Sequence, residues 1–267
     1  MSPLTPTIEQ LFAFGPNIIT GTGGSGTRVV ARIVRDGGMF IGTHLGPNNQ
    51  DAREFHAFFD RWINPFMTRD AVPLLPASAA EMAHDFRAAL ERHCAELGPV
   101  PRPWGWKTPR GLFLLPFFHS QLPTLKLLHL VRDGRDMAYS KRRRHLKMHG
   151  SAVLGPTAED WSEPLKLMAS WQRVNLLALD YGEQHLPGQY LVVRFEDLCG
   201  DPVRTIEQIF DFFGLSGDAE ALARLEVAQP ESLGRWREQD PDILAELHHI
   251  GEAALQRFGY AVPSRRA

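Results

Sequence analysis

The stretch 19-ITGTGGSGTRVVARIV-34 holds four glycines within six residues, between a short apolar run and a segment with helical spacing. The run that ends at Gly21 is typical of a buried strand, and four apolar residues of 29–34 repeat as on one face of a helix. A glycine-rich turn between a strand and a helix can offer backbone N–H groups to an anion, and the helix adds the positive end of its dipole. The stretch therefore predicts a phosphate-binding loop.

The spacing of this loop is close to that of a nucleoside-triphosphate loop but differs at its end. Gly21 to Gly26 follow the GxxxxG pattern, and Thr27–Arg28 stand where a Lys–Ser/Thr pair is expected. A kinase or ATPase uses that lysine at the β- and γ-phosphates and that hydroxyl on Mg²⁺. Two interpretations stay open from the residues alone: an anion site that includes Ser25, Thr27 and Arg28, and tight strand–helix packing without a ligand.

The composition limits the class of protein. The 267 residues are 43% hydrophobic and 22% charged, which predicts one globular domain over 1–267. The formal net charge of −2 argues against bulk binding of nucleic acid. Two distant cysteines, Cys94 and Cys199, fit a reducing cytosol, and no segment has the pattern of a signal peptide or a membrane span. We expect a cytoplasmic protein without a metal site.

Strand and helix patterns alternate along the chain, which predicts an α/β fold. This fold has three layers, with helices on both faces of a mostly parallel sheet. Five aromatic residues of 55–66 share one helical stripe, which is typical of a core. The expected strands are Asn17–Gly21, Met39–Thr43, Trp104–Lys107, Leu125–Val131 and Tyr190–Val193, and the expected helices are 25–36, 51–66, 78–97, 111–122, a helix from 133 into the basic run, 158–185, 201–213 and one or two in the tail.

A second stretch, 127-LLHLVRDGRDMAYSKRRR-144, begins with the most strongly apolar strand pattern of the chain. That strand delivers Arg132 to its carboxyl end, where ligands bind in open α/β sheets. Ser140 falls about two turns into the next helix, and an arginine with a hydroxyl can hold a phosphate. The alternative is a solvated cluster in which the charged residues of 132–136 pair with one another. The basic run Lys141–Lys147 is typical of a solvated helix face, although it could also meet an anionic acceptor or extend the field around a phosphate.

Together, the two stretches resemble the sulfotransferase superfamily, in its bacterial and Golgi-type branch with a P-loop-like domain. The resemblance rests on the S-G-T loop after the first strand and on V-R-D-G-R-D with a later serine. Members of that family move the sulfuryl group of 3′-phosphoadenosine 5′-phosphosulfate (PAPS) to a hydroxyl or amine. The resemblance implies that Arg132 and Ser140 hold the 3′-phosphate. It also implies that the 5′-phosphosulfate rests on Gly23, Gly24, Ser25, Gly26, Thr27 and Arg28.

Three further stretches are similar to segments of the same family. The stretch 104-WGWKTPRGLFLLPFF-118 is similar to the Lys-x-Pro segment of the protein-tyrosine and bacterial carbohydrate branches, and 194-RFEDLCGDPVRTIEQIFDFFGL-215 to a late E-D-L element. The tail 234-GRWRE-238 is similar to a basic segment that closes over the nucleotide, which implies a nucleotide contact for Arg235. The acceptor is left open among small molecules, carbohydrates, lipids and peptides, because acceptor pockets come from variable loops.

One position departs from the family pattern. The residue before S-G-T is usually a lysine or arginine that touches the sulfate, and here it is Gly24. Charge builds on the leaving oxygen during sulfuryl transfer, so a cation is expected at this place. The resemblance of W-K-T-P implies Lys107 as the principal cation, with Arg28 in support. The alternative for Lys107 is a surface lysine at the end of a strand.

A general base must take the proton of the acceptor. The family uses a histidine or a carboxylate after the second strand, and 42-GTHLGPNNQDAREFH-56 offers Asp51 first and His44 second. Glu54 and His56 are expected to face solvent, and a helix N-cap is the alternative role for Asp51. Two other functions are compatible with the sequence. They are a phosphotransferase that uses ATP–Mg²⁺ and a non-catalytic nucleotide-binding module with a degenerate site.

Overall fold

The computed structural model describes residues 12–68, 76–98 and 102–262. In this part of the chain four strands form one sheet in the order β2-β1-β3-β4, and every neighbouring pair is parallel. Because the strands are parallel, their carboxyl ends share one edge, where β2 ends at Lys107 opposite Ile19 of β1. The bounds are β1 Asn17–Gly21, β2 Gly105–Lys107, β3 Lys126–Val131 and β4 Tyr190–Arg194.

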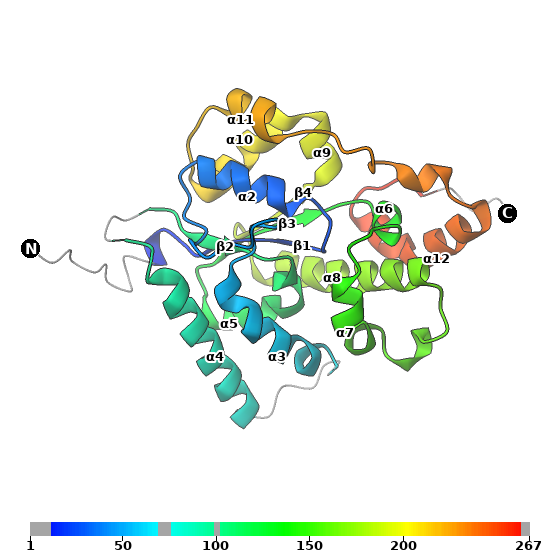
Figure 1. Cartoon of the computed structure of the whole chain (residues 1–267), viewed down its shortest axis with the longest axis horizontal. Helices are drawn as coiled ribbons and strands as arrows, with labels where there is room; N and C mark the ends of the chain where they lie inside the picture. Colours follow the sequence, from blue (N-terminus) through cyan, green and yellow to red (C-terminus); the bar gives the residue numbers. More distant parts are fainter. Residues whose placement is uncertain (1–11, 69–75, 99–101, 263–267) are drawn as a thin grey trace, which may run out of the picture.

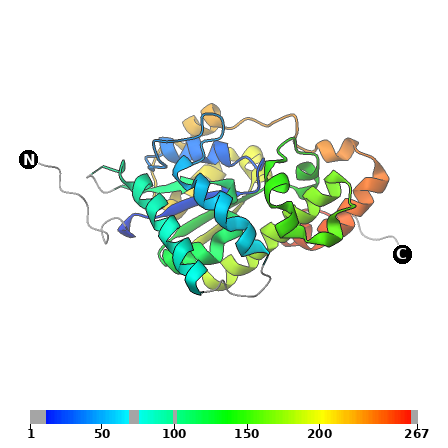
Figure 2. The same cartoon turned by 60° about the horizontal axis from the view of Figure 1, so that its bottom comes forward.

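Helices cover both faces of the sheet, which confirms the expected three-layer α/β fold (Figures 1 and 2). On one face an apolar core forms between the sheet and a first helical layer. On the other face a second core holds most of the aromatic side chains. The first layer consists of α2 Thr27–Asp36, α9 Phe195–Gly200, α10 Pro202–Phe213 and α11 Ala219–Glu226, and the second of α3 His56–Met67, α4 Pro76–Cys94, α5 Leu115–Gln121 and α8 Glu163–His185.

A third helical group lies beyond the carboxyl edge of the sheet, at the right of Figure 1. Its core joins Val131 at the end of β3 to Met137, Trp171 and Leu247. This group carries the segments that will form one wall of the site. It contains α6 Gly134–Ala138 and α12 Pro241–Arg257. The helix α7 Arg144–Leu154 packs on α3 and α8, and short 3-10 helices lie at Arg53–Phe55, Pro109–Leu114, Pro156–Ala158 and Arg235–Glu238.

Two expected elements were wrong. Residues 39–43 do not form a strand, because only Phe40 bridges to Trp104 and Gly42 then turns the chain with φ of 106°. The helix expected from 133 into the basic run is broken into α6 and α7. Ser140 therefore lies in the connection after α6 and not two turns into a helix.

The aromatic stripe of residues 55–66, which begins just before α3 and continues along it, is core, as its spacing predicts. Phe55, Phe58, Phe59 and Trp62 are at most 5% exposed, and Phe66 packs partly buried against them. Stacking of Phe55 on Trp106 of β2, with ring centroids 4.7 Å apart, ties the stripe to the sheet. These rings hold α3 beside the strand that ends at Lys107.

Candidate active site

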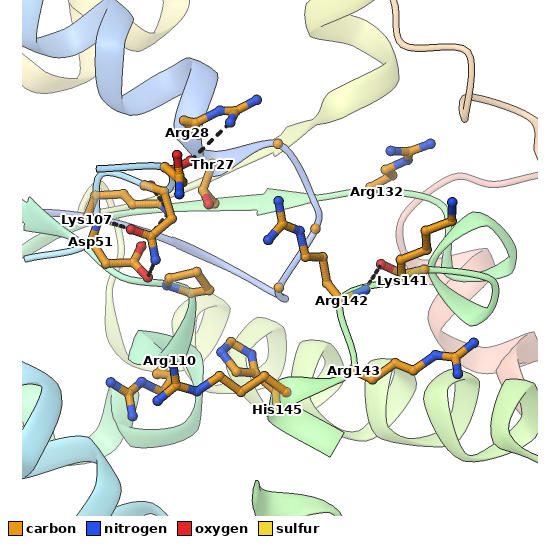
Figure 3. A pocket seen from close by; sticks show the side chains of 18 of the residues that line it. Thr27, Arg28, Asp51, Lys107, Arg110, Arg132, Lys141, Arg142, Arg143 and His145 are labelled. Carbon is orange, nitrogen blue, oxygen red and sulfur yellow. Dashed lines mark hydrogen bonds and ion pairs between the residues drawn. The ribbon is translucent and has the colours of Figure 1, made fainter. Parts of the chain in front are cut away.

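A cavity of about 650 Å³ opens at the carboxyl edge of the sheet (Figure 3). Its walls come from the glycine loop after β1, residues 48–51, the end of β2, the connection between α6 and α7, and residues 232–235. Asp51 is the acidic residue that lines it. In a chain with net charge −2, such a concentration of positive charge predicts an anionic ligand. The basic lining residues are Arg28, Lys107, Arg110, Arg132, Lys141, Arg142, Arg143, Arg144 and Arg235.

The glycine loop forms the cavity wall next to α2. Gly24 and Gly26 have φ of 108° and 98°, and a Cβ atom at Gly26 would enter the ring of Phe195. The loop leads into the first turn of α2, where the N–H of Val29 donates to the carbonyl oxygen of Gly26 at 2.9 Å and the N–H groups before it lie too early for an i→i−4 bond. Gly23, Gly24, Gly26 and Thr27 line the cavity, whereas Ser25 is fully buried and its hydroxyl faces Gly21. An anion at this wall would therefore contact mainly backbone N–H groups and few side chains.

Lys107 and Asp51 form an ion pair in the floor of the cavity. Lys107 is 2% exposed, and its Nζ donates to Asp51 Oδ1 at 2.6 Å and to the carbonyl oxygen of Asn49 at 2.8 Å. The amide of Asn49 donates to the other oxygen of Asp51 at 2.5 Å. Arg28 steadies the same loop, because its Nη1 donates to the carbonyl oxygen of Asn48 at 3.0 Å. A buried ammonium group and a carboxylate are therefore held side by side where β2 ends.

Burial lowers the pKa of Lys107 from 10.5, the charge and hydrogen bond of Asp51 act against this shift, and the charges of Arg28 and Arg142 add to it. The lysine therefore loses its proton at a lower pH than a free lysine does. A reaction that needs its charge should slow as the pH rises through this lowered pKa.

Arg132 forms the opposite end of the cavity. Its Nη2 donates to Asp136 Oδ2 at 2.9 Å and to the carbonyl oxygen of Ser232 at 2.5 Å, whereas its buried Nε has no partner among the described residues. Asp136 also accepts from the N–H of Gly234 at 2.8 Å, and Arg235 donates to the carbonyl oxygen of Asp136 at 2.6 Å. Asp136 thus fastens the distant segment 232–235 beside Arg132, with Ser140 on the same wall.

The third side of the cavity carries Arg110, His56 and His145. Arg110 is 6% exposed, forms an ion pair with Asp60 and lies over the ring of Phe59 at 5.0 Å. Burial, and then the charge of Arg110, lower the pKa values of His56 and His145, the latter to about 3. Both imidazoles are therefore neutral at pH 7, and this side of the cavity combines a fixed cation with two neutral rings.

The low pKa of His145 predicts acid sensitivity of the ligand-free protein. The unfolded chain takes up a proton at this residue below about pH 6.5, and the folded chain does so only near pH 3. The contribution to stability is therefore complete above pH 6.5 and is lost as the pH falls. We expect His145→Gln to reduce the loss of unfolding free energy by at most about 1.4 kcal/mol per pH unit between pH 6.5 and 4, measured by urea unfolding.

The matched control is His44→Gln, because the His44 side chain is 84% exposed. This variant should keep the acid sensitivity of the wild-type chain. Equal slopes for His145→Gln and the wild type would contradict the expectation.

A comparison of the sequence with known protein families identifies the region that contains these site residues. A family model described as "Sulfotransferase family" matches residues 16–219, more than half of the chain. The chain belongs to the sulfotransferase family. The matched region contains the glycine loop, Lys107, Arg132 and Ser140, which are the positions on which the resemblance rests.

Curated relatives of this family member share part of its sequence. Carbohydrate sulfotransferase 2 of Homo sapiens is 30% identical over 132 residues, which cover 38% of this chain and 25% of that protein. Carbohydrate sulfotransferase 5 of Mus musculus is 31% identical over 111 residues, which cover 38% and 28%. The chain thus spans about a quarter of the length of these relatives.

Solved structures of the family share the fold. Sulfotransferase STF9 from Mycobacterium avium has a TM-score of 0.56 at 16% identity, with 94% of this chain and 78% of that chain covered. The sulfotransferase domain of the Synechococcus PCC 7002 olefin synthase gives 0.53 at 21% identity, with 93% and 96% covered. Mouse sulfotransferase SULT7A1, complexed with PAP, gives 0.53 at 15% identity, with 93% and 88% covered.

The cavity of this sulfotransferase-family chain brings together most of the residues that the sequence singles out. The Ser25 side chain is buried on the side of the loop away from the cavity, and His44 lies outside the cavity lining. His44 approaches Glu54, at 3.8 Å between Nδ1 and Oε1. The predicted residues that line the cavity are Gly23, Gly24, Gly26, Thr27, Arg28, Asp51, Lys107, Arg132, Ser140 and Arg235.

Sequence reasoning missed several lining residues. His56 and Glu54 were expected to face solvent, but His56 lines the cavity and the Glu54 side chain is 8% exposed. Arg110 was not predicted, although it follows Lys107 by three residues, just beyond the end of β2. That position at the carboxyl edge is the signal that could have identified Arg110. Arg142 belongs to a basic run whose pattern favoured a solvated helix face, with contact to an anionic acceptor as the alternative, and residues 141–144 of this run line the cavity.

Proposed function

We propose that this chain is a PAPS-dependent sulfotransferase that modifies a hydroxyl or amine of an acceptor. The observation that carries the proposal is the single basic cavity that joins the glycine loop, Lys107 and Arg132. The unpartnered buried Nε of Arg132 fits a ligand that completes its hydrogen bonds. When bound, PAPS supplies the activated sulfuryl group. A neighbour of the same fold is complexed with PAP, the product 3′-phosphoadenosine 5′-phosphate, which agrees with this assignment.

Each end of the cavity has its own task in the proposal. Arg132, Ser140 and Arg235 bind the 3′-phosphate, and the glycine loop with Thr27 and Arg28 binds the 5′ end. Ser25 supports the loop from below. Lys107 stabilises the charge that develops on the leaving oxygen, because its buried ammonium group acts in surroundings of low dielectric constant.

Asp51 takes the proton of the acceptor in this proposal, and His44 is not assigned a part because it lies outside the cavity lining. We expect Asp51→Asn to lower turnover about 100-fold, since general-base removal typically costs that much or more. The neighbouring His56 has no hydrogen bond to its ring among the described residues and provides the matched comparison. His56→Gln keeps a hydrogen-bonding side chain in the cavity lining and should change turnover less than about threefold.

A large loss of turnover in His56→Gln with a small loss in Asp51→Asn would instead identify His56 as the general base. A His56 base would lose activity as the pH falls through its lowered pKa, below 6.5, because protonation removes the lone pair. The rate of sulfuryl transfer between pH 5 and 8, measured for both variants, separates the two assignments.

We propose a carbohydrate as the acceptor. The related proteins named above are carbohydrate sulfotransferases, and the acceptor side of the cavity is lined by Arg110, His56 and Asn49. The aromatic stripe of α3 packs into the core instead of lining the cavity, which argues against a wide apolar pocket. Hydroxyl groups of a sugar can be held by such donors and acceptors. Small molecules, lipids and peptides are the comparison classes in an acceptor screen.

A cytoplasmic location is part of the proposal. Both described cysteines, Cys94 and Cys199, are free thiols, as expected in a reducing compartment. No helix in residues 12–68, 76–98 and 102–262 has the length and apolar character that crossing a bilayer requires.

The first test is calorimetry of the purified chain with PAP, 5′-AMP and ATP–Mg²⁺. We expect PAP to bind about 100-fold more tightly than 5′-AMP, because only PAP carries the 3′-phosphate. Tight, Mg²⁺-dependent binding of ATP would contradict the proposal and support a phosphotransferase. Binding of PAP without transfer to any acceptor would support a non-catalytic nucleotide-binding module.

A further inference from the structure

The glycine loop has no side chain at Gly24, and both the backbone conformation and the packing around this residue disfavour one. The φ of 108° at Gly24 is rare for any residue with a Cβ atom. A Cβ atom there would lie 3.1 Å from Ser140 Oγ and 3.2 Å from Met137 Cε. The end of α6 and its following connection therefore pack on the bare backbone of Gly24. A lysine or arginine at this position would strain the loop, and the side chains of Ser140 and Met137 would have to shift by a few tenths of an ångström.

Arg142 comes from the same connection and extends over Gly24. Its backbone N–H donates to Ser140 Oγ at 3.1 Å, which turns the chain directly after Ser140. Its Cγ lies 3.7 Å from the position of a Cβ atom at Gly24. Figure 3 shows the Arg142 guanidinium directed into the cavity, between the curve of the glycine loop and the Lys107–Asp51 pair. Within the described residues this guanidinium has no hydrogen-bond or ion-pair partner.

Neighbouring cations are used differently. Arg28 donates to the carbonyl oxygen of Asn48, and Arg143 forms an ion pair with Glu163 at 2.6 Å. Figure 3 shows Arg143 directed away from the glycine loop. The charge of Arg142 reaches Lys107, since it contributes to lowering the pKa of that lysine. Arg142 therefore brings an uncommitted positive charge to the point where the glycine loop and Lys107 face each other.

We propose that Arg142 is the cation at the transferring sulfuryl group. It replaces the basic residue that is expected before S-G-T, where this chain has Gly24. This inference rests on the proposed function. The acceptor oxygen forms a bond to sulfur while the bond from sulfur to the 5′-phosphate oxygen breaks. The electron pair of that bond stays on the phosphate oxygen, and the acceptor proton passes to Asp51. Arg142 and Lys107 stabilise the charge on the sulfuryl and phosphate oxygens from two sides.

The fold gives a physical reason why the cation comes from Arg142 and not from residue 24. A side chain on the glycine loop and a side chain on the connection after α6 would compete for the same space above residue 24. Arg142 follows Ser140 by two residues in this connection. One segment therefore carries both the serine that binds the 3′-phosphate and the arginine that contacts the sulfuryl group. Binding of the nucleotide through Ser140 would thereby orient Arg142 as well.

The test uses the whole chain and two substitutions, Arg142→Ala and Arg142→Lys. PAP affinity is measured by calorimetry, and PAPS turnover is measured as released PAP, with water or an acceptor from the screen. Lys147→Ala is the matched control, because it removes one positive charge from the same basic run at an exposed position outside the cavity lining. Arg142 is itself an exposed loop residue, so we expect its variants to fold.

Arg142→Ala should lower PAPS turnover about 100-fold and PAP affinity less than about fivefold, because PAP lacks the sulfuryl group. Arg142→Lys should recover about tenfold of the lost rate, since it restores the charge without the planar fork. Wild-type turnover in Arg142→Ala, or a parallel loss of PAP affinity and turnover, would overturn the inference. A wild-type chain that binds neither PAP nor PAPS would instead overturn the proposed function.

Discussion

The Lys107→Met variant is expected to transfer sulfuryl groups about 10³-fold more slowly than the wild-type chain, because a preorganised charge in a buried site contributes that much to catalysis. Methionine has a similar shape, so it removes the ammonium group and keeps most of the packing at the end of β2. The rate is measured as PAP released from PAPS at saturating donor. PAP affinity should change far less than turnover, since the charge acts mainly on the leaving oxygen.

Loss of Lys107 also leaves Asp51 without its ion-pair partner, and this could destabilise the chain by about 3 kcal/mol. The double variant Asp51→Asn/Lys107→Met removes both charges and provides the control. It should unfold at a higher denaturant concentration than Lys107→Met and still be inactive. A Lys107→Met chain with near wild-type turnover would show that Lys107 only anchors Asn49 and Asp51, as its hydrogen bonds allow.

Arg132→Ala is expected to remove most of the discrimination between PAP and 5′-AMP. In the proposed complex Arg132 binds the 3′-phosphate, and this contact is the main difference between the two nucleotides. We expect a wild-type ratio of affinities of about 100 to fall to about 3 in the variant, because a charge-assisted contact to phosphate is lost. The measurement is calorimetry with both nucleotides under identical salt, since such contacts are screened by ions.

The ratio is a better readout than the affinity for PAP itself. Arg132 also pairs with Asp136, which holds Gly234 and Arg235 in place, so the substitution can loosen residues 232–235. Such loosening can also displace Arg235, which the proposal places at the 3′-phosphate, so Arg235→Ala measures how much of the fall in the ratio comes from that residue. Arg204→Ala serves as a matched control, because Arg204 lies on α10 and outside the cavity lining. An unchanged ratio in Arg132→Ala would remove Arg132 from the 3′-phosphate site.

Much of the fold follows from local patterns. The apolar runs 17–21 and 126–131 become neighbouring strands β1 and β3, and the glycine loop leads into α2 as its spacing predicts. Residues 39–43 have a strand-like pattern as well, but they only bridge at Phe40. Hydrophobic periodicity does not tell a strand from an extended segment that lies along the edge of a sheet.

The break between α6 and α7 shows a second limit. Residues 133–149 have an almost continuous helical pattern, yet the chain leaves the helix at Tyr139 and turns where Ser140 Oγ accepts from the N–H of Arg142. A serine side chain that bonds to nearby backbone competes with helix formation, and packing on Gly24 favours the turn here. Without this break Arg142 would not extend over the glycine loop.

The sequence by itself determined the parallel α/β architecture, the glycine loop and the positions of Lys107 and Arg132 at strand ends, because each depends on short-range spacing. Only the tertiary structure decided which distant groups meet. Lys107 pairs with Asp51 across 56 positions, and Asp136 binds Gly234 across 98. Such contacts depend on how loops close over the edge of the sheet, and loop closure is set by packing and hydrogen bonds that leave no periodic pattern in the sequence.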